Sequence, residues 1–178
     1  MEDRYFARFL EKSLKTDAVR PLAGGVKPKV NLLFGARQTG KSTLLGHCIS
    51  KGKSVLVLNL QDRRERRRYE AEPGLLVREF EAAPEIDTVF IDEIQKVPAV
   101  LDDIQLLYDR ESRRRRFFLT GSSARRLKRG SANLLPGRAR THLVSPVLQA
   151  EHRQTDLLAL PMTGKPRFPS RTLEDCLV

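Results

Sequence analysis

The chain has 178 residues, of which 40% are hydrophobic and 31% are charged, a balance typical of one globular domain with a sizeable core. Its net charge of +11 attracts polyanions in general. No apolar run approaches the roughly 20 residues that span a bilayer, the charged start Met1–Arg4 lacks the apolar core of a signal peptide, and two cysteines build no disulfide framework. We therefore expect a cytoplasmic protein without a membrane partner.

The N-terminal segment is expected to precede the core. Four apolar residues recur there at helical spacing: Phe6, Phe9, Leu10 and Leu14. This spacing predicts a short amphipathic helix over residues 5–15. Prolines and glycines between residues 21 and 28 then break the chain. We expect residues 1–28 to form an N-terminal helix and linker.

A strand, a glycine-rich loop and a helix are predicted next. Val30–Phe34 is a short apolar run, and residues 35–42 match the P-loop pattern G-x-x-x-x-G-K-[ST] in every fixed position. Gly35 and Gly40 are expected to allow turns closed to other residues, so that backbone N–H groups converge on phosphate oxygens. The predicted helix Thr43–Ile49 would add the partial positive charge of its N-terminus.

Two side chains of this motif have expected roles on a nucleoside triphosphate. Lys41 would reach the β- and γ-phosphates, and the Ser42 hydroxyl would coordinate Mg²⁺. The expected nucleotide-contacting residues are Gly35, Ala36, Arg37, Gln38, Thr39, Gly40, Lys41, Ser42 and Thr43.

The middle of the chain continues the alternation of strands and helices. Val55–Leu60 is a near-continuous apolar run, which predicts a strand buried on both faces. An arginine-rich loop is expected after it, and Pro73 is predicted to open a helix through Phe80. Thr88–Ile91 is the third predicted strand.

The later elements repeat this order. Pro98 is predicted to begin a helix, and Phe117–Thr120 and Thr141–Val144 are predicted strands, with a short basic helix over Ala124–Lys128 between them. The alternation predicts an α/β protein with a parallel sheet covered by helices on both faces. We expect the core to span residues 29–151 and a proline-rich basic tail to span 152–178.

Asp92 and Glu93 directly follow the third predicted strand. Parallel α/β sheets bind ligands at the carboxyl ends of their strands, so Asp92 is expected beside the P-loop, where it could hold Mg²⁺ as a Walker B residue. Glu93 could then polarise a water molecule for attack on the γ-phosphate. This pattern favours ATP hydrolysis, and no guanine-reading motif is found.

Two arginine-rich runs, Arg63–Arg68 and Arg113–Arg116, account for much of the positive charge. They could contact nucleic acid or an acidic protein, or they could form an ordinary solvated surface. Apart from Tyr69, no aromatic residue lies beside them, which gives base stacking no support.

Several short motifs together resemble a large prokaryotic family of AAA-type P-loop ATPases, known mainly as ATP-binding proteins. An additional strand between the P-loop strand and the Walker B strand, for which Val55–Leu60 is a candidate, is typical of this group. The resemblance covers roughly residues 4 to 151. The motifs are Gly-Ala-Arg-Gln-Thr-Gly-Lys-Ser-Thr-Leu-Leu at 35–45, Ile-Asp-Glu-Ile-Gln-Lys-Val-Pro at 91–98, Phe-Leu-Thr-Gly-Ser-Ser-Ala-Arg-Arg-Leu at 118–127 and Leu-Leu-Pro-Gly-Arg-Ala at 134–139.

The resemblance implies further roles. Thr120 would act as a sensor of the γ-phosphate or orient the attacking water, with Ser122 nearby, and Arg138 would be an arginine finger or a sensor of the bound nucleotide, in cis or in trans. Gln95 matches the family pattern without an evident chemical role. Relatives continue into a second, C-terminal domain, which this chain is expected to lack.

The function expected from these observations is binding of ATP with Mg²⁺ and its hydrolysis, coupled to a conformational change. Catalysis would depend on Glu93, Lys41, Thr120 and Arg138, and the metal on Ser42 and Asp92. Two alternatives stay open: a nucleotide-gated binding module with little turnover, and a nucleic-acid-binding protein in which the P-loop is secondary. A homo-oligomer is a further expectation.

Overall fold

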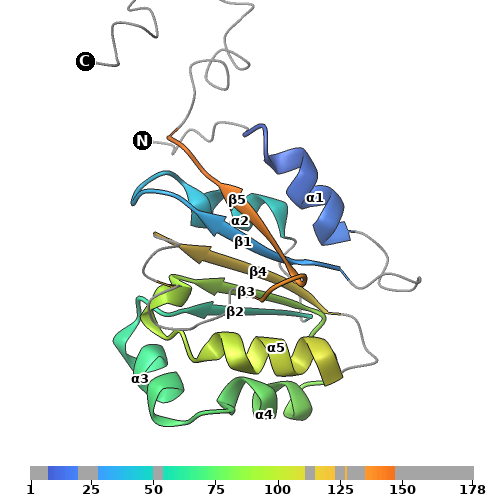
Figure 1. The fold of residues 1–178 in the computed structure, drawn as a ribbon, viewed down its shortest axis with the longest axis vertical. Coiled ribbons are helices and arrows are strands. Elements are labelled where there is room, and N and C mark those ends of the chain that lie inside the picture. Colours follow the sequence, from blue (N-terminus) through green and yellow to red (C-terminus); the bar gives the residue numbers. More distant parts are fainter. Residues whose placement is uncertain are drawn as a thin grey trace, which may run out of the picture.

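Five parallel strands form the centre of the protein in a computed structural model, which describes residues 8–19, 28–49, 54–110, 115–122, 127 and 135–146. Across the sheet the strands lie in the order β2–β3–β4–β1–β5 (Figure 1). Their bounds are β1 (Val30–Phe34), β2 (Val55–Asn59), β3 (Thr88–Asp92), β4 (Arg116–Gly121) and β5 (Ala139–Leu143).

Helices pack on both faces of this sheet. Their bounds are α1 (Glu11–Val19), α2 (Lys41–Cys48), α3 (Arg63–Ala71), α4 (Leu75–Ala82) and α5 (Val100–Arg110), with a 3₁₀ turn η1 (Ile94–Lys96) after β3. Figure 1 shows α1 and α2 on one side of the sheet and α3, α4 and α5 on the other. The predicted α/β architecture is confirmed. Among the residues that the structure describes, no helix has the length and apolarity needed to cross a membrane.

The alternation of side chains along β1 explains why both faces need a cover. Val30, Leu32 and Phe34 pack into one buried cluster with residues of α4 and α5. Leu33 points the other way and packs with Leu14 of α1 and with Leu44 and Leu45 of α2. Because successive side chains of a strand point to opposite faces, an all-apolar strand of this kind requires two helical layers.

The additional strand of the sheet is β4, which pairs with β1 on one side and with β3 on the other. The apolar run that separates the P-loop from Asp92 in the sequence is a different strand. It forms β2, which lies at the edge of the sheet and pairs only with β3. The additional-strand topology is therefore present, but the inserted strand is β4, which comes after Asp92 and Glu93 in the sequence.

The prediction that this run is buried on both faces is wrong. Leu58 is buried against the α4 and α5 side, whereas the side chain of Val57, which points to the other face, is 59% exposed. The cluster under α1 and α2 takes side chains from β1, β3 and β4 and extends to Val55 at the start of β2, but it does not include Val57.

The first arginine run forms helix α3 instead of the predicted loop. The Asp62 side chain accepts a hydrogen bond from the Arg64 backbone N–H at 2.7 Å and so caps the helix. Glu65 in the first turn pairs with Arg68 one turn later, at 2.9 Å. Arginine is itself a good helix former, so an arginine-rich run is compatible with a helix as well as with a loop.

Other predicted boundaries also differ from the structure, among them the start of the helix expected at Pro73, which begins at Leu75. Helix α1 begins at Glu11, later than expected, and Phe9 before it is 55% exposed. Helix α5 begins at Val100, two residues after Pro98. Of the predicted basic helix at 124–128 only Leu127, which is helical, is described. Phe6, Arg113, Arg114 and the tail at 152–178 lie outside the described residues.

Replacing Val57 of β2 and Val89 of β3 by alanine, one at a time, tests whether β2 lies at the edge of the sheet. Val89→Ala, at a position with no exposure in β3, should lower the free energy of unfolding by about 2 kcal/mol, because a buried apolar group is lost and a cavity is left. Val57→Ala should change it by less than about 0.5 kcal/mol. Urea unfolding of both variants measures the difference, and equal losses would show that the outer face of β2 is covered.

Candidate functional site

The P-loop connects β1 to α2 at the carboxyl edge of the sheet. A Cβ atom at Gly35 would lie 2.1 Å from the carbonyl oxygen of Val144, so this position requires glycine for lack of space. Its backbone φ is not positive, unlike that of Gly40, which is +78° at the start of α2. The expectation of an unusual turn is therefore correct for Gly40 only, and Gly35 is needed because the segment after β5 lies against the loop.

Lys41 lies buried within the loop. Its Nζ donates hydrogen bonds to the carbonyl oxygens of Gly35 at 3.0 Å and Ala36 at 2.7 Å. Burial lowers the pKa of the lysine, while the nearby carboxylates of Glu93 and Asp92 oppose that shift. It also donates to the Thr39 hydroxyl at 3.5 Å, so the described partners of the ammonium are neutral oxygens, and an anion entering the loop would be a stronger partner.

Ser42 and Asp92, which lie 50 positions apart, meet across the sheet. The Ser42 hydroxyl donates a hydrogen bond to Asp92 Oδ1 at 2.9 Å. A hydroxyl and a carboxylate are oxygen ligands of the kind that Mg²⁺ prefers in proteins. The donor set therefore fits the metal that the P-loop motif implies.

The Thr120 hydroxyl contacts both acidic residues, Asp92 and Glu93. The threonine is fully buried at the end of β4, donates a hydrogen bond to Asp92 Oδ1 and accepts one from the Glu93 backbone N–H at 3.2 Å. Its hydroxyl is therefore already engaged with protein groups on both sides. This geometry holds the two acidic residues in place, and the predicted contact of Thr120 with a water molecule or a phosphate stays a prediction.

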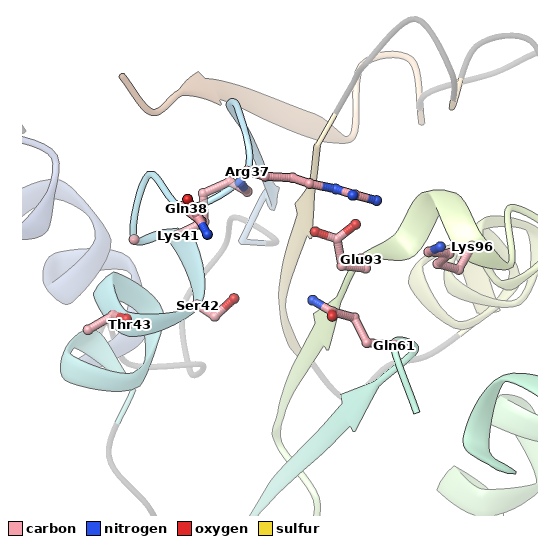
Figure 2. Close-up of a pocket in the computed structure, with 9 residues that line it drawn as sticks. Arg37, Gln38, Lys41, Ser42, Thr43, Gln61, Glu93 and Lys96 are labelled. Carbon is pink, nitrogen blue, oxygen red and sulfur yellow. The ribbon is translucent and has the colours of Figure 1, made fainter. Parts of the chain in front are cut away.

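A pocket of about 440 Å³ lies at the P-loop. Figure 2 shows the side chain of Arg37 extending from the loop across to the Glu93 carboxylate, with Ser42 below. The lining residues are Arg37, Gln38, Gly40, Lys41, Ser42, Thr43, Gln61, Glu93 and Lys96. Three cationic side chains thus line one small pocket together with Glu93.

Gln61 and Lys96 line this pocket but were not singled out from the sequence. Gln61 follows β2, and Lys96 ends the 3₁₀ turn after β3. Both follow the carboxyl end of a strand, the edge at which parallel sheets bind ligands. That rule, applied to every strand, could have found them.

Arg8, which precedes α1, forms a hydrogen bond to the P-loop. Its guanidinium is largely buried and donates to the carbonyl oxygens of Thr39 at 2.9 Å and Ser145 at 2.5 Å. The residues before α1 and after β5 are thereby tied to the P-loop. Beside Arg8 lies a smaller pocket of about 160 Å³, lined on its apolar side by Phe9, Leu10, Leu44, Leu143 and Val144.

Arg138 lies at the opposite end of the sheet. Its carbonyl oxygen accepts a hydrogen bond from Val30, the first residue of β1, and its guanidinium forms a two-point ion pair with Asp109 at 2.7 and 2.9 Å. At about 3.3 Å per residue, β1 puts roughly 16 Å between Arg138 and the P-loop. This position gives no support to the expected role in cis, and the role of Arg138 stays a prediction.

The described part of the second arginine run has structural partners. Arg115 is buried with its guanidinium carbon 4.1 Å from the centre of the Phe80 ring. Arg116 contacts Asp87 at 3.3 Å. Neither residue is available for a nucleic acid without rearrangement.

A parallel sheet in this order, with a P-loop after β1 and the acidic pair Asp92–Glu93 at the carboxyl end of β3, defines the α/β P-loop NTPase fold. The chain belongs to the AAA-domain family, because the model of that family matches residues 27–152. No protein of curated function matches the sequence.

A solved structure reported as "Structural Basis for Katanin Self-Assembly" has a similar fold, with a TM-score of 0.57 and 19% identity. The match covers 90% of this chain and 59% of the other. The present chain therefore spans less than two thirds of that protein's length.

Two glycines provide a matched test of the loop geometry. A Cβ at Gly46, in α2, meets nothing within 4 Å, so Gly46→Ala should raise the free energy of unfolding by about 0.5–1 kcal/mol. Gly35→Ala should lower it by about 1–3 kcal/mol, because the loop or the segment at Val144 must shift. Thermal and urea unfolding measure both, and a neutral Gly35→Ala would refute the close approach.

Proposed function

We propose that the chain binds ATP with Mg²⁺ in the pocket at the P-loop and hydrolyses it to ADP and phosphate. The observation that carries this proposal is the 2.9 Å contact between Ser42 Oγ and Asp92 Oδ1, with Lys41 and Glu93 lining the same pocket. Membership of the AAA-domain family supports it.

Each group has a defined task in this reaction. Lys41 would exchange its bonds to the Gly35 and Ala36 carbonyls for bonds to phosphate oxygens. Ser42 and Asp92 would hold Mg²⁺, which neutralises charge on the phosphates. The backbone N–H groups of the loop and of the start of α2 would bind the remaining phosphate oxygens.

Glu93 is the proposed general base. The oxygen of a water molecule forms a bond to the γ-phosphorus, the bond to the oxygen bridging the β- and γ-phosphorus atoms breaks, and the proton of the water passes to the Glu93 carboxylate. Arg37 and Lys96 would stabilise negative charge around the transferred group. Thr120 is assigned to positioning, because its hydroxyl already contacts both acidic residues.

Two substitutions separate binding from hydrolysis. Lys41→Ala should abolish ATP binding measured by calorimetry, because the loop loses its ammonium. Glu93→Gln should leave binding intact and lower kcat for phosphate release by about 10²-fold or more. Lys12→Ala in α1 and Glu85→Gln before β3, both exposed, serve as controls and should behave like the wild type. Equal turnover by the wild type and Glu93→Gln would rule out the assigned mechanism.

The same assay distinguishes the alternative functions. A stoichiometric ATP complex without phosphate release favours a nucleotide-gated binding module. Turnover that rises when DNA or RNA is added favours a nucleic-acid partner, for which the exposed arginines of α3 are the candidate surface.

Arg138 is proposed to act on a neighbouring copy of the chain. It lies too far from its own pocket, yet its guanidinium is partly exposed and is held by a surface ion pair with Asp109 and a hydrogen bond to the Pro136 carbonyl oxygen. The match to a structure concerned with katanin self-assembly is consistent with association of such domains. A neighbour presenting Arg138 to the pocket would supply a positive charge to the transferred phosphoryl group.

Mixing two inactive variants tests this action in trans. Arg138→Ala should lower kcat by about 10³-fold and Lys41→Ala should not bind ATP, but their mixture should regain activity, because the Lys41→Ala copy presents an intact Arg138. Arg78→Ala, which breaks another exposed ion pair, is the control and should keep wild-type activity. Light scattering with ATP present should show a mass above that of the monomer. A mixture that stays inactive, or full activity of Arg138→Ala, would contradict the proposal.

A further inference from the structure

Gln95 links the acidic pair to the end of β4. Its Nε2 donates hydrogen bonds to Glu93 Oε2 and, at 3.0 Å, to Ser122 Oγ, while its Oε1 accepts one from the Ser122 backbone N–H at 3.3 Å. The partners fix the orientation of the amide, since an ionised carboxylate only accepts and a backbone N–H only donates. Each polar atom of the amide therefore has a suitable partner.

The backbone around Gly121 leaves room for this amide. A Cβ at Gly121 would lie 2.8 Å from Gln95 Oε1 and 3.0 Å from the Phe34 ring. Glycine at this position thus lets the Gln95 side chain lie directly over β4. The two sequence motifs that contain Gln95 and Gly121–Ser122 are interlocked by this contact.

The backbone of Glu93 is held independently of its side chain. Glu93 has a φ of +59°, in the left-handed region that non-glycine residues rarely adopt. Its N–H donates to Thr120 and its carbonyl oxygen accepts from the Lys96 N–H at 2.9 Å. These backbone contacts do not fix the three side-chain torsions of the glutamate. The hydrogen bond from Gln95 restrains the carboxylate instead.

The two carboxylate oxygens of Glu93 consequently differ. Oε2 is bonded to Gln95, whereas Oε1 has no hydrogen-bond partner in the part of the chain that the structure describes. The carboxylate faces the pocket and the Arg37 side chain in Figure 2. One oxygen is therefore restrained and the other is left for the contents of the pocket.

We infer that Gln95 is a positioning residue that holds the Glu93 carboxylate for proton transfer, with Ser122 as its anchor on β4. This inference rests on the proposed ATP hydrolysis and assigns a new residue to it. Gln95 does not line the pocket, so its loss should reduce the rate of the chemical step and leave the affinity for ATP unchanged.

The test compares Gln95→Met, which keeps the side-chain size and removes the hydrogen bonds, with the control Gln105→Met on α5. Gln95→Met should lower kcat by about 10- to 100-fold, as loss of a positioning contact does, with KM and the calorimetric Kd for ATP within about twofold of the wild type. Ser122→Ala, a milder change, should lower kcat less. Gln105→Met should match the wild type.

A double variant shows whether Gln95 acts through Glu93. In the Glu93→Gln background, Gln95→Met should cause no further loss of the residual single-turnover rate, because the group that it positions is gone. A further loss of the same size, or a change in KM alone, would overturn the inference. Turnover that is abolished by Glu93→Gln but untouched by Gln95→Met would overturn the inference and leave the proposed function standing, whereas equal rates for the wild type and Glu93→Gln would overturn both.

Discussion

The insertion of β4 between β1 and β3 is the constraint on which the site depends. Neighbouring strands lie about 4.8 Å apart, so the carboxyl ends of β1 and β3 are separated by roughly 10 Å. The P-loop leaves the sheet from β1 and the acidic pair leaves it from β3, with Thr120 of β4 between them. Ser42 reaches Asp92, and Gln95 reaches Ser122, only because this order and the parallel register bring the three strand ends to one edge.

The pocket also depends on a balance of charge. Asp92 and Glu93 are adjacent carboxylates, and like charges at this distance repel each other. Asp92 accepts hydrogen bonds from Ser42 and Thr120, and Glu93 accepts one from Gln95, so each carboxylate has a donor beside it. Burial opposes the charged form of Lys41 and lowers its pKa. Cationic side chains and a carboxylate thus line one pocket, an arrangement suited to a charged ligand.

The sequence predicted those parts of the fold that depend on local patterns. Val30–Phe34 forms a strand at the expected residues, and four apolar residues of the segment predicted to be the following helix are buried: Leu44, Leu45, Cys48 and Ile49. The meeting of Ser42 with Asp92 followed from the rule that parallel strands bind ligands at their carboxyl ends. The edge position of β2 could not be predicted, because an apolar run indicates a strand but does not give its place in the order of strands. The place of Arg138 depends on the same order, since a residue before β5 lies at the amino end of β1 only when these two strands pair in parallel.

By itself, the sequence determined the chemistry available to this protein: a phosphate-binding loop, an acidic pair after an apolar strand, and the helices and strands that carry them. These features are local, because hydrogen bonds and side-chain alternation within a few residues define them. Only the tertiary structure decided which of them act together. It showed that Gly35 is required by the nearby carbonyl of Val144, that Thr120 is engaged with the acidic pair, and that Gln95 restrains Glu93. These contacts join residues from different strands, and their distances are set by strand order and register, which no local pattern encodes.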